Sequence, residues 1–463
     1  FATDVVDLCS VGVAPAKEFK VLSGKTLRIA KAIKEEDIQG ELIFENNSSL
    51  LQTSIVQNTA ENVTYKRITA PMLRFDYTYY SSPVTGMPLI NVSPGTLLDK
   101  FYSFRNNEWF QEDASGLMQP GEGYIIRAPQ SFEVVGTKVP FAVGFSGKPN
   151  NGPIESTISP VAEHYNLVGN PYPSAVDILP FVQANTFLDG SIYLWDHITA
   201  PSPLYPGATT FAYNNNDYVA KNVLGTPNGP DDFYVAAGQS FMIKTAVAGS
   251  PIANWTNNMR VGSTNVDFHK VQNDKNATHQ IVSEESISTG TSTQSAGRFW
   301  LDLHANNGSV KRLLVGYING ATDGIDRLYD AAPMDVGTSA FYALGSNNEP
   351  LSIIGKGLPF DDEQIIPLGF ATAVSGNHTI SKFLEDGFMS NYVVYLNDRL
   401  TNTLHNLSEA SYTFATATGT FNDRFIIAFK PKTVKSINVD VRANKVVVFD
   451  KLEAVQLHSG QEL

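Results

Sequence analysis

Short runs in which apolar and polar residues alternate occur along most of the chain and predict strands rather than helices. Near the N-terminus, residues 21–29 and 41–44 follow this pattern, and Gly and Asn residues punctuate the runs. A period of two places alternate side chains on one buried face, as in a half-buried β-strand. Because the turn-rich stretch 40–52 is typical of a chain that winds in short parallel rungs, we expect residues 1–65 to form a short β-solenoid-like segment.

Three pairs of similar segments occur in the same order and predict an internal duplication. The paired segments are 77–83 with 165–171, 101–104 with 192–195, and 120–128 with 237–245. The distance between the copies grows along the chain, so the second copy carries an insertion, which we assign to the polar stretch 201–232. We therefore expect one β-rich domain at 66–264, with units at about 66–145 and 160–250.

Proline and glycine fix the ends of the strands in each unit. Pro83 and Pro171 have no backbone N–H to donate, so each is expected to end the strand before it. Gly121 and Gly238 suit a turn with positive φ before the final strand of each unit.

The second half of the chain predicts a separate β-sandwich. Residues 265–297 are polar and are expected to connect the two halves, and 432–463 begin a further β-rich segment. Eight strand candidates with turn residues between them predict a sandwich at 298–431. They are residues 299–303, 312–318, 341–344, 351–354, 366–370, 392–396, 411–415 and 424–429. The predicted fold class is all-β, with tandem β-sandwich or jelly-roll-like domains and a β-solenoid-like N-terminal segment.

Composition narrows the classes of partner. The 463 residues carry a formal charge of −13, which would repel a phosphate backbone, so we expect no nucleic-acid partner. A single cysteine, Cys9, excludes an internal disulfide and a Cys-based zinc cluster. No apolar run approaches the roughly 18 residues of a membrane-spanning helix, so we expect no membrane span.

Motifs of the common enzyme classes are missing from the sequence. It has no Gly-x-Ser-x-Gly elbow, no His-Glu-x-x-His and no Gly-x-Gly-x-x-Gly. The nearest phosphate-loop match ends in Ser23-Gly-Lys-Thr, but Phe19 stands where the first glycine belongs. We expect a protein that is not an enzyme.

Clustered carboxylates are the candidate metal ligands, because calcium binds oxygen atoms. Asp323, Asp326 and Asp330 lie close together, but without the spacing of a calcium-binding loop. Loop capping is the favoured interpretation, and a structural calcium ion is the alternative. No other cofactor is expected. Weaker candidates for a cation site are Asp217, Asp231, Asp232 and the group at 361–363.

Tryptophans are the candidate ligand-binding residues, since an exposed ring can stack on a sugar. Trp195 and Trp300 lie in apolar alternation and are expected to be buried, whereas Trp109 and Trp255 have polar neighbours and are the better candidates for exposure. A surface glycan is therefore a candidate partner.

Several long motifs resemble the region upstream of the sorting domain in Bacteroidota surface proteins that are exported by type IX secretion. They include YTYYSSPV at 77–84, GEGYIIRAP at 121–129, YNLVGNPYPSA at 165–175, LLVGYINGATDGID at 313–326 and GTFNDRF at 419–425. The resemblance covers nearly the whole chain, with 432–463 matching only the start of a sorting domain.

This resemblance implies a secreted or cell-surface protein whose partners are the type IX translocon and its outer-membrane shuttle components. It implies a structural or adhesive role without enzymatic activity. The alternative is a glycan-binding module of a larger secreted polysaccharide-degrading protein.

Overall fold

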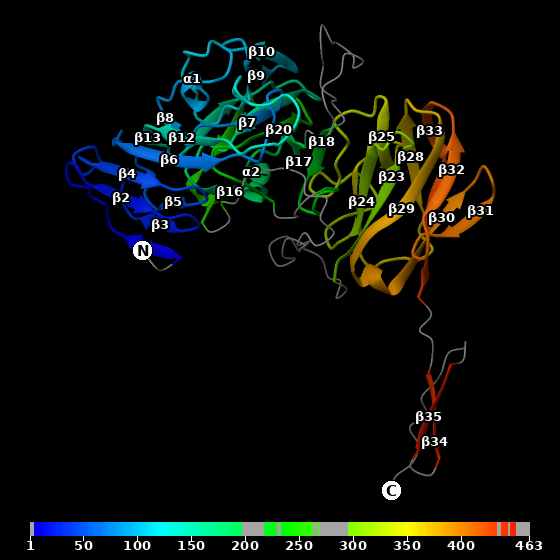
Figure 1. Ribbon diagram of the computed structural model, residues 1–463. Helices are drawn as coiled ribbons and strands as arrows, with labels where there is room; N and C mark the ends of the chain where they lie inside the picture. Colours follow the sequence, from blue (N-terminus) through cyan, green and yellow to red (C-terminus); the bar gives the residue numbers. More distant parts are fainter. Residues whose placement is uncertain are drawn as a thin grey trace.

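The computed structural model describes residues 4–196, 217–228, 233–262, 265, 268 and 295–432, together with the backbone of β34 (Ile437–Arg442) and β35 (Lys445–Asp450). The fold is all-β, as predicted, and the α-helices of the described residues are the short α1 (Leu89–Val92) and α2 (Ile178–Ala184). Figure 1 shows the N-terminal strands and the duplicated region on one side and the C-terminal sandwich on the other.

The N-terminal strands form the predicted short solenoid. Two columns of parallel strands stack rung upon rung, with Leu27, Phe44 and Leu50 fully buried between them. The first column is β1 (Val5–Leu8), β3 (Thr26–Ile29) and β5 (Ser49–Gln52), and the second is β2 (Glu18–Val21), β4 (Glu41–Phe44) and β6 (Val63–Ile68). The last rung strand, β6, also pairs antiparallel with β12 (Ala142–Ser146), so the solenoid and the first repeat share a sheet.

Two four-stranded sheets with the same strand order form the centre of the duplicated region. In each sheet the strand that comes last along the chain lies between the first and second strands of its unit, and a hairpin strand occupies one edge. The first sheet is β7 (Tyr77–Tyr80), β11 (Tyr124–Arg127), β9 (Phe101–Arg105) and β10 (Glu108–Gln111). The second is β15 (Tyr165–Gly169), β20 (Ser240–Thr245), β17 (Leu188–Trp195) and β18 (Tyr218–Lys221).

The smaller strand pairs repeat as well. The pair β6 with β12 corresponds to β14 (Ile154–Thr157) with β21 (Ile252–Trp255). The pair β8 (Val84–Thr85) with β13 (Lys148–Pro149) corresponds to β16 (Ala175–Asp177) with β22 (Arg260–Val261), and β16 also pairs with β19 (Tyr234–Val235). We therefore call residues 63–149 the first repeat and residues 154–261 the second repeat.

The two repeats exchange contacts reciprocally. At the end of β7, Tyr80 pairs with Gln239 of the second repeat, and at the equivalent place in β15, Val168 pairs with Glu122 of the first. A glycine with φ of 82° stands directly before each of these partners, as the third residue of a turn, which confirms the positive φ predicted for Gly121 and Gly238. Reciprocal exchange of this kind indicates an approximate two-fold relation between the repeats.

The C-terminal half is a sandwich of two sheets, and each of the eight strand candidates there contains a strand. One sheet has the order β27 (Ile353–Lys356), β24 (Val310–Tyr317), β23 (Gly297–His304), β29 (Gly376–Gly387) and β32 (Tyr412–Thr416). The other has the order β26 (Pro350–Leu351), β25 (Ser339–Leu344), β28 (Ile366–Thr372), β33 (Gly419–Pro431), β30 (Tyr392–Asp398) and β31 (Thr403–Asn406). The strands β29 and β31 were not predicted. A cluster of buried apolar side chains fills the space between the sheets.

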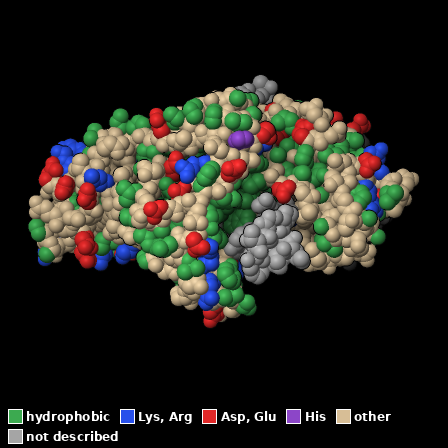
Figure 2. Space-filling view, turned by 90° about the horizontal axis from the view of Figure 1, so that it is seen from above, with side chains coloured by type: hydrophobic (Ala, Val, Ile, Leu, Met, Phe, Trp, Pro, Cys, Tyr) green, Lys and Arg blue, Asp and Glu red, His purple; other side chains and the backbone are tan. Residues whose placement is uncertain are grey.

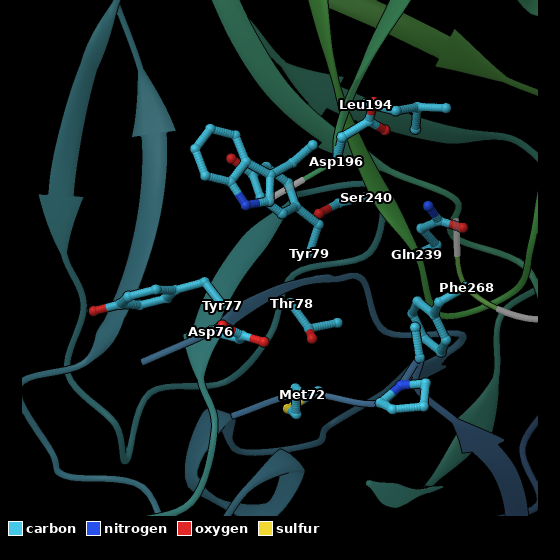
Figure 3. Close-up of a pocket in the computed structure, with 13 residues that line it drawn as sticks. Met72, Asp76, Tyr77, Thr78, Tyr79, Leu194, Asp196, Gln239, Ser240 and Phe268 are labelled. Atoms are coloured by element: carbon cyan, nitrogen blue, oxygen red, sulfur yellow. The ribbon is translucent and has the colours of Figure 1, made fainter. Parts of the chain in front are cut away.

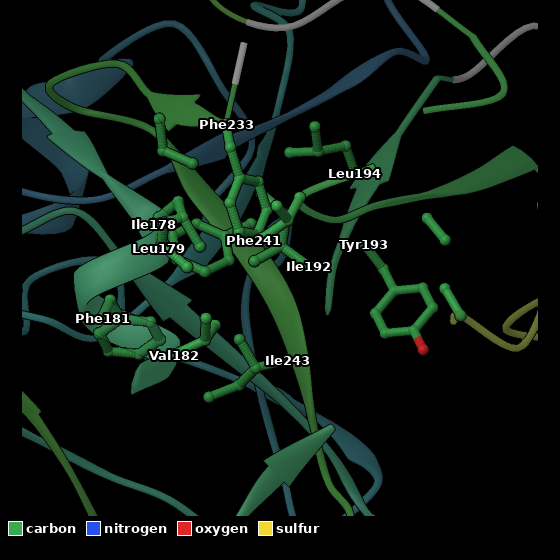
Figure 4. Close-up of a cluster of buried hydrophobic side chains, with 14 of the residues drawn as sticks. Ile178, Leu179, Phe181, Val182, Ile192, Tyr193, Leu194, Phe233, Phe241 and Ile243 are labelled. Atoms are coloured by element: carbon green, nitrogen blue, oxygen red, sulfur yellow. The ribbon is translucent and has the colours of Figure 1, made fainter. Parts of the chain in front are cut away.

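The sandwich is joined to the second repeat by buried contacts. Arg298 Nη1 donates to the carbonyl of Leu224 at 2.7 Å, and Trp300 Nε1 donates to the carbonyl of Thr226 at 3.0 Å. One hydrophobic cluster continues from the second repeat into the sandwich, and Figure 4 shows part of it around α2, β17 and β20. The two halves therefore share a core.

Candidate functional site

Trp109 is exposed, as predicted. It lies in the edge strand β10 with 42% of its surface exposed, and its ring meets that of Phe104 edge-on with centroids 4.8 Å apart. Tyr102 and Tyr77 form a second edge-on pair on the same sheet, at 6.3 Å. These rings provide apolar surface that a sugar can contact, and sugar stacking on Trp109 stays a prediction.

The exposure predicted for Trp255 is wrong. Trp255 is fully buried, its Nε1 donates to Ser156 Oγ at 2.8 Å, and it stacks on Phe181 with centroids 4.0 Å apart. In β21 the burial alternates, so the neighbouring Asn254 points outward while Trp255 points into the core. Polar neighbours in sequence therefore gave no information about the face on which this ring lies. Trp300 is fully buried as predicted.

The same arrangement of four aromatic rings recurs in both repeats, which the sequence alignment alone did not reveal. In each set, one edge-on pair joins the first and second strands of the unit across the strand that lies between them. The other edge-on pair joins the two strands of the hairpin at the edge of the sheet. The second set has centroid distances of 5.3 and 4.8 Å. The sets are Tyr77, Tyr102, Phe104 and Trp109 in the first repeat, and Tyr165, Tyr193, Trp195 and Tyr218 in the second. We call them the first and second aromatic quartets.

The second quartet is covered where the sandwich approaches it. Tyr193 is fully buried and donates to Asp189 Oδ2 at 2.7 Å, and burial raises the pKa of Asp189 to about 6. A Cβ atom on Gly190 would lie 2.1 Å from the carbonyl oxygen of Arg327, so the sandwich backbone passes directly over β17. In Figure 4, Tyr193 points toward the olive ribbon of the sandwich. The first quartet has no such cover among the described residues, and Trp109 remains open.

A shallow pocket lies between the repeats, beside both quartets (Figure 3). Its volume of about 60 Å³ is far below the roughly 300–1,000 Å³ of small-molecule sites. Tyr79 hydrogen-bonds the hydroxyl of Tyr218, and Asp76 accepts a hydrogen bond from the backbone of Leu73 at 2.9 Å. Tyr77 extends away from the other labelled side chains in Figure 3. The pocket can hold water or the edge of a ligand, but it is too small for a substrate.

Two of the three aspartates proposed as calcium ligands, Asp326 and Asp330, accept hydrogen bonds from backbone N–H groups. Asp326 Oδ2 accepts from the backbone of Thr322 at 2.5 Å, and the two oxygens of Asp330 accept from Asp326 N at 2.6 Å and Gly355 N at 2.8 Å. Asp323 accepts instead from a glutamine side chain. In the described part of the chain, no three His, Cys, Asp or Glu residues are grouped to hold a metal ion. The geometry favours loop capping, and the calcium ion stays a prediction.

The weaker cation candidates do not add a site. Asp217 is buried within the second repeat, and the group at 361–363 lies in a turn where Asp361 accepts from the backbone of Glu363. Asp231 and Asp232 lie outside the described residues.

Two serine–histidine pairs are in contact within the described residues, but each lacks the rest of a catalytic arrangement. In one, Ser381 Oγ and Asp302 Oδ2 approach the same nitrogen of His304, Nε2, at 3.2 and 3.8 Å, so the aspartate does not orient the ring from its other nitrogen. In the other, Ser159 Oγ lies 2.9 Å from His164 Nδ1. Ser159 is only 3% exposed, and no carboxylate among the described residues contacts His164. A buried hydroxyl without an oriented base does not form the nucleophile of a Ser–His–Asp site. The absence of enzymatic activity stays a prediction.

No helix within the described ranges is long and apolar enough to cross a membrane.

The chain matches one family of known proteins over most of its length. The family model described as "Domain of unknown function (DUF8693)" matches residues 3–429, so the chain belongs to this family. A curated relative, the minor fimbrium subunit Mfa5 of Porphyromonas gingivalis, is 24% identical over 302 residues. The alignment covers 61% of this chain and 22% of that protein, so the chain spans about a fifth of the relative's length. No solved structure matches the chain.

Proposed function

We propose that this member of the DUF8693 family is a structural or adhesive part of a larger bacterial surface protein, and not an enzyme. The observation that carries the proposal is the way in which solenoid, repeats and sandwich are tied into one body by buried contacts. Its similarity to a fimbrial subunit and the small volume of its pocket support the same role. A part that bears load or displays a binding surface needs stiffness more than a reactive cleft.

A buried polar clamp around Arg260 ties the solenoid to both repeats. Arg260 Nη1 donates to Asn151 Oδ1 at 2.7 Å, and Nη2 donates to the carbonyl of Leu50 in β5 at 2.5 Å. Asn151 Nδ2 in turn donates to the carbonyls of Ser54 and Val56 at 2.7 and 2.8 Å. Burial lowers the pKa of Arg260 to about 10, so the side chain stays charged at neutral pH. Buried hydrogen-bonded networks of this kind stiffen the segments that they join, although Arg260 Nε has no hydrogen-bond partner within the described residues.

We further propose export through the type IX translocon with its outer-membrane shuttle components, and location at the cell surface or outside the cell. The motifs at 121–129, 165–175 and 313–326 support this route through their resemblance to exported Bacteroidota proteins. The fimbrial relative from Porphyromonas gingivalis is in keeping with such a location.

Protease digestion of intact cells of the bacterium that encodes the chain tests the export route and the surface location together. Protease treatment of intact cells is expected to remove the chain, while a periplasmic marker stays intact. In a strain without a functional type IX translocon, the chain is expected to remain inside and resist the protease. Surface exposure that is unchanged in that strain would refute the proposed route.

A second candidate function, glycan binding, rests on the exposed ring of Trp109. A glycan array probed with the whole chain is expected to give signals that Trp109→Ala abolishes. Leu400→Ala is the matched control, because Leu400 is 74% exposed and lies at the far end of the sandwich, in the turn before β31. Binding that both variants lose equally, or that neither loses, would remove this candidate.

A further inference from the structure

The edge strand β10 carries an open apolar surface. It is the last strand of its sheet, and none of the strands that the structure describes pairs with its outer side. All four of its residues are exposed, including Trp109 at 42% and Phe110 at 36%. Natural edge strands are often protected by Pro, Lys or a bulge, and β10 has none of these, although it is only four residues long and carries the charge of Glu108. Its backbone groups are therefore available for pairing with another strand.

Three exposed leucines extend this apolar surface. Leu97, Leu98 and Leu117 are 43%, 68% and 52% exposed, and they lie in the segments just before β9 and just after β10. We call these residues together with Trp109 and Phe110 the β10 patch. Figure 2 views the molecule from the side on which β9 and β10 lie in Figure 1, and shows hydrophobic side chains interspersed with polar and charged ones there. Large exposed apolar side chains beside an unpaired strand edge favour a contact site.

In the second repeat, the sandwich covers the surface that corresponds to the β10 patch. The strand pairing places Phe110 at the position of Val219, because Trp109 pairs with Phe104 as Tyr218 pairs with Trp195. Val219 is 5% exposed and belongs to the cluster that continues into the sandwich. The carbonyl of Leu188 also accepts from Arg327 of the sandwich at 3.1 Å. The first repeat has an apolar residue at the same position but no cover within the described residues.

We propose that the β10 patch binds a second copy of this chain through antiparallel pairing of the two β10 strands. A two-fold axis perpendicular to the sheets reverses the strand direction and keeps each face on its own side. The free backbone edge is therefore complementary to itself. The pairing joins two four-stranded sheets into one continuous sheet.

Charge selects the register of this pairing. With the axis at Trp109, the two Trp109 rings face each other and Glu108 lies opposite Phe110 of the other chain. Arg105 pairs with Glu112 of its own chain at 2.7 Å and lies over the ring of Phe110, 5.1 Å from its centroid, so its guanidinium is also within reach of Glu108 of the other chain. With the axis at Phe110, Glu108 would instead face Glu112 of the other chain, and like charges directly opposite are unfavourable. The register centred on Trp109 is therefore the favoured one.

Sedimentation equilibrium of the whole chain with charge-reversal variants tests the proposal. The wild-type chain is expected to form a dimer at concentrations up to about 100 µM. Arg105→Glu and Glu108→Arg each place like charges at both symmetric contacts, so each variant alone is expected to raise the dimer Kd by about ten-fold or more. An equimolar mixture of the two variants restores opposite charges at both contacts and is expected to recover a Kd near that of the wild type.

The controls separate this contact from other ways of covering the patch. Trp109→Ala is expected to weaken the dimer, whereas Leu400→Ala, at a residue that is 74% exposed elsewhere, is expected to leave it unchanged. A chain that stays monomeric would overturn the proposal, and Trp109-dependent glycan binding by that monomer would assign the patch to a sugar. A dimer Kd that the charge-reversal variants leave unchanged would overturn the proposed pairing. A Kd that the mixture of the two variants fails to restore would overturn it as well.

Discussion

Replacing Arg260 tests whether the solenoid and the repeats are held together by the buried clamp. Arg260→Met keeps much of the side-chain volume and removes three hydrogen bonds, to Asn151 Oδ1, to Asn257 Oδ1 and to the carbonyl of Leu50. It also removes the guanidinium that lies 5.0 Å from the centroid of the Tyr172 ring. Methionine offers no donor, so the buried carbonyl of Leu50 loses this partner, whereas Asn151 Oδ1 still accepts from Asn257 Nδ2 at 3.1 Å.

The expected cost follows from these contacts. Hydrogen bonds to a charged group contribute about 1.5–3 kcal/mol each, and a buried acceptor left without a partner costs about 1–3 kcal/mol. Methionine recovers part of this by burying apolar surface. We expect a net local destabilisation of about 3 kcal/mol. That value corresponds to a roughly hundred-fold increase in local opening.

Hydrogen exchange measured by mass spectrometry reports this change segment by segment, which matters because a chain of several domains does not unfold in two states. Exchange is expected to accelerate about a hundred-fold in β5 and in residues 150–153, and to stay unchanged in the sandwich strand β28. Arg28→Met is the control, because Arg28 makes an exposed ion pair with Asp7 that contributes at most about 1 kcal/mol. Unchanged exchange in β5, or equal acceleration in β28, would refute the idea of a clamp.

Four further results are expected. Tyr317 is fully buried and its hydroxyl has no hydrogen-bond partner among the residues that the structure describes, so Tyr317→Phe is expected to raise the free energy of unfolding by about 1 kcal/mol. Tyr172 donates to the carbonyl of Gly152 at 2.7 Å, so Tyr172→Phe is expected to lower it by about the same amount; thermal denaturation that shows the opposite order would contradict both. Burial raises the pKa of Asp189 to about 6, above its unfolded value of about 3.9, so the wild type is expected to lose stability relative to Asp189→Asn as pH rises from about 4 to about 6, and parallel stability curves would exclude this. Adding EDTA is expected to leave the melting temperature unchanged, because the aspartates of the 323–330 loop already accept hydrogen bonds, whereas a drop of several degrees would demonstrate a bound cation.

The alternation of apolar and polar residues was sufficient to predict many of the strands, because most strands here have one buried face. The strand β4 occupies the predicted residues 41–44, and β7 and β15 end just before Pro83 and Pro171. The strand β29 was missed for a physical reason. Its pairing with β23 shifts register between Trp300 and Leu301, so the alternation of buried and exposed positions is interrupted within β29. A pattern search with a period of two does not detect such a strand.

The candidate site was less predictable, because burial there depends on distant segments. Trp109 and Trp255 both have polar neighbours, yet one is exposed and the other lies in the core. The two aromatic quartets have similar ring geometry, and their difference in exposure comes from a sandwich that begins more than 100 residues after Tyr193 and covers one of them only. Such a difference has no local signature in the chain.

The exchanged strand pairing between the repeats sets the order in which they can fold when the chain leaves a ribosome or a pore one end first. Tyr80 finds its partner only when Gln239 has appeared, and Val168 stays bound to a residue of the earlier repeat. Long-range pairing of this kind slows folding and exposes unpaired edges until it is complete. A chain that passes through a narrow pore therefore stays incompletely folded until nearly the whole duplicated region is outside. A cut between the repeats would leave two fragments, each with an open edge, in place of two working domains.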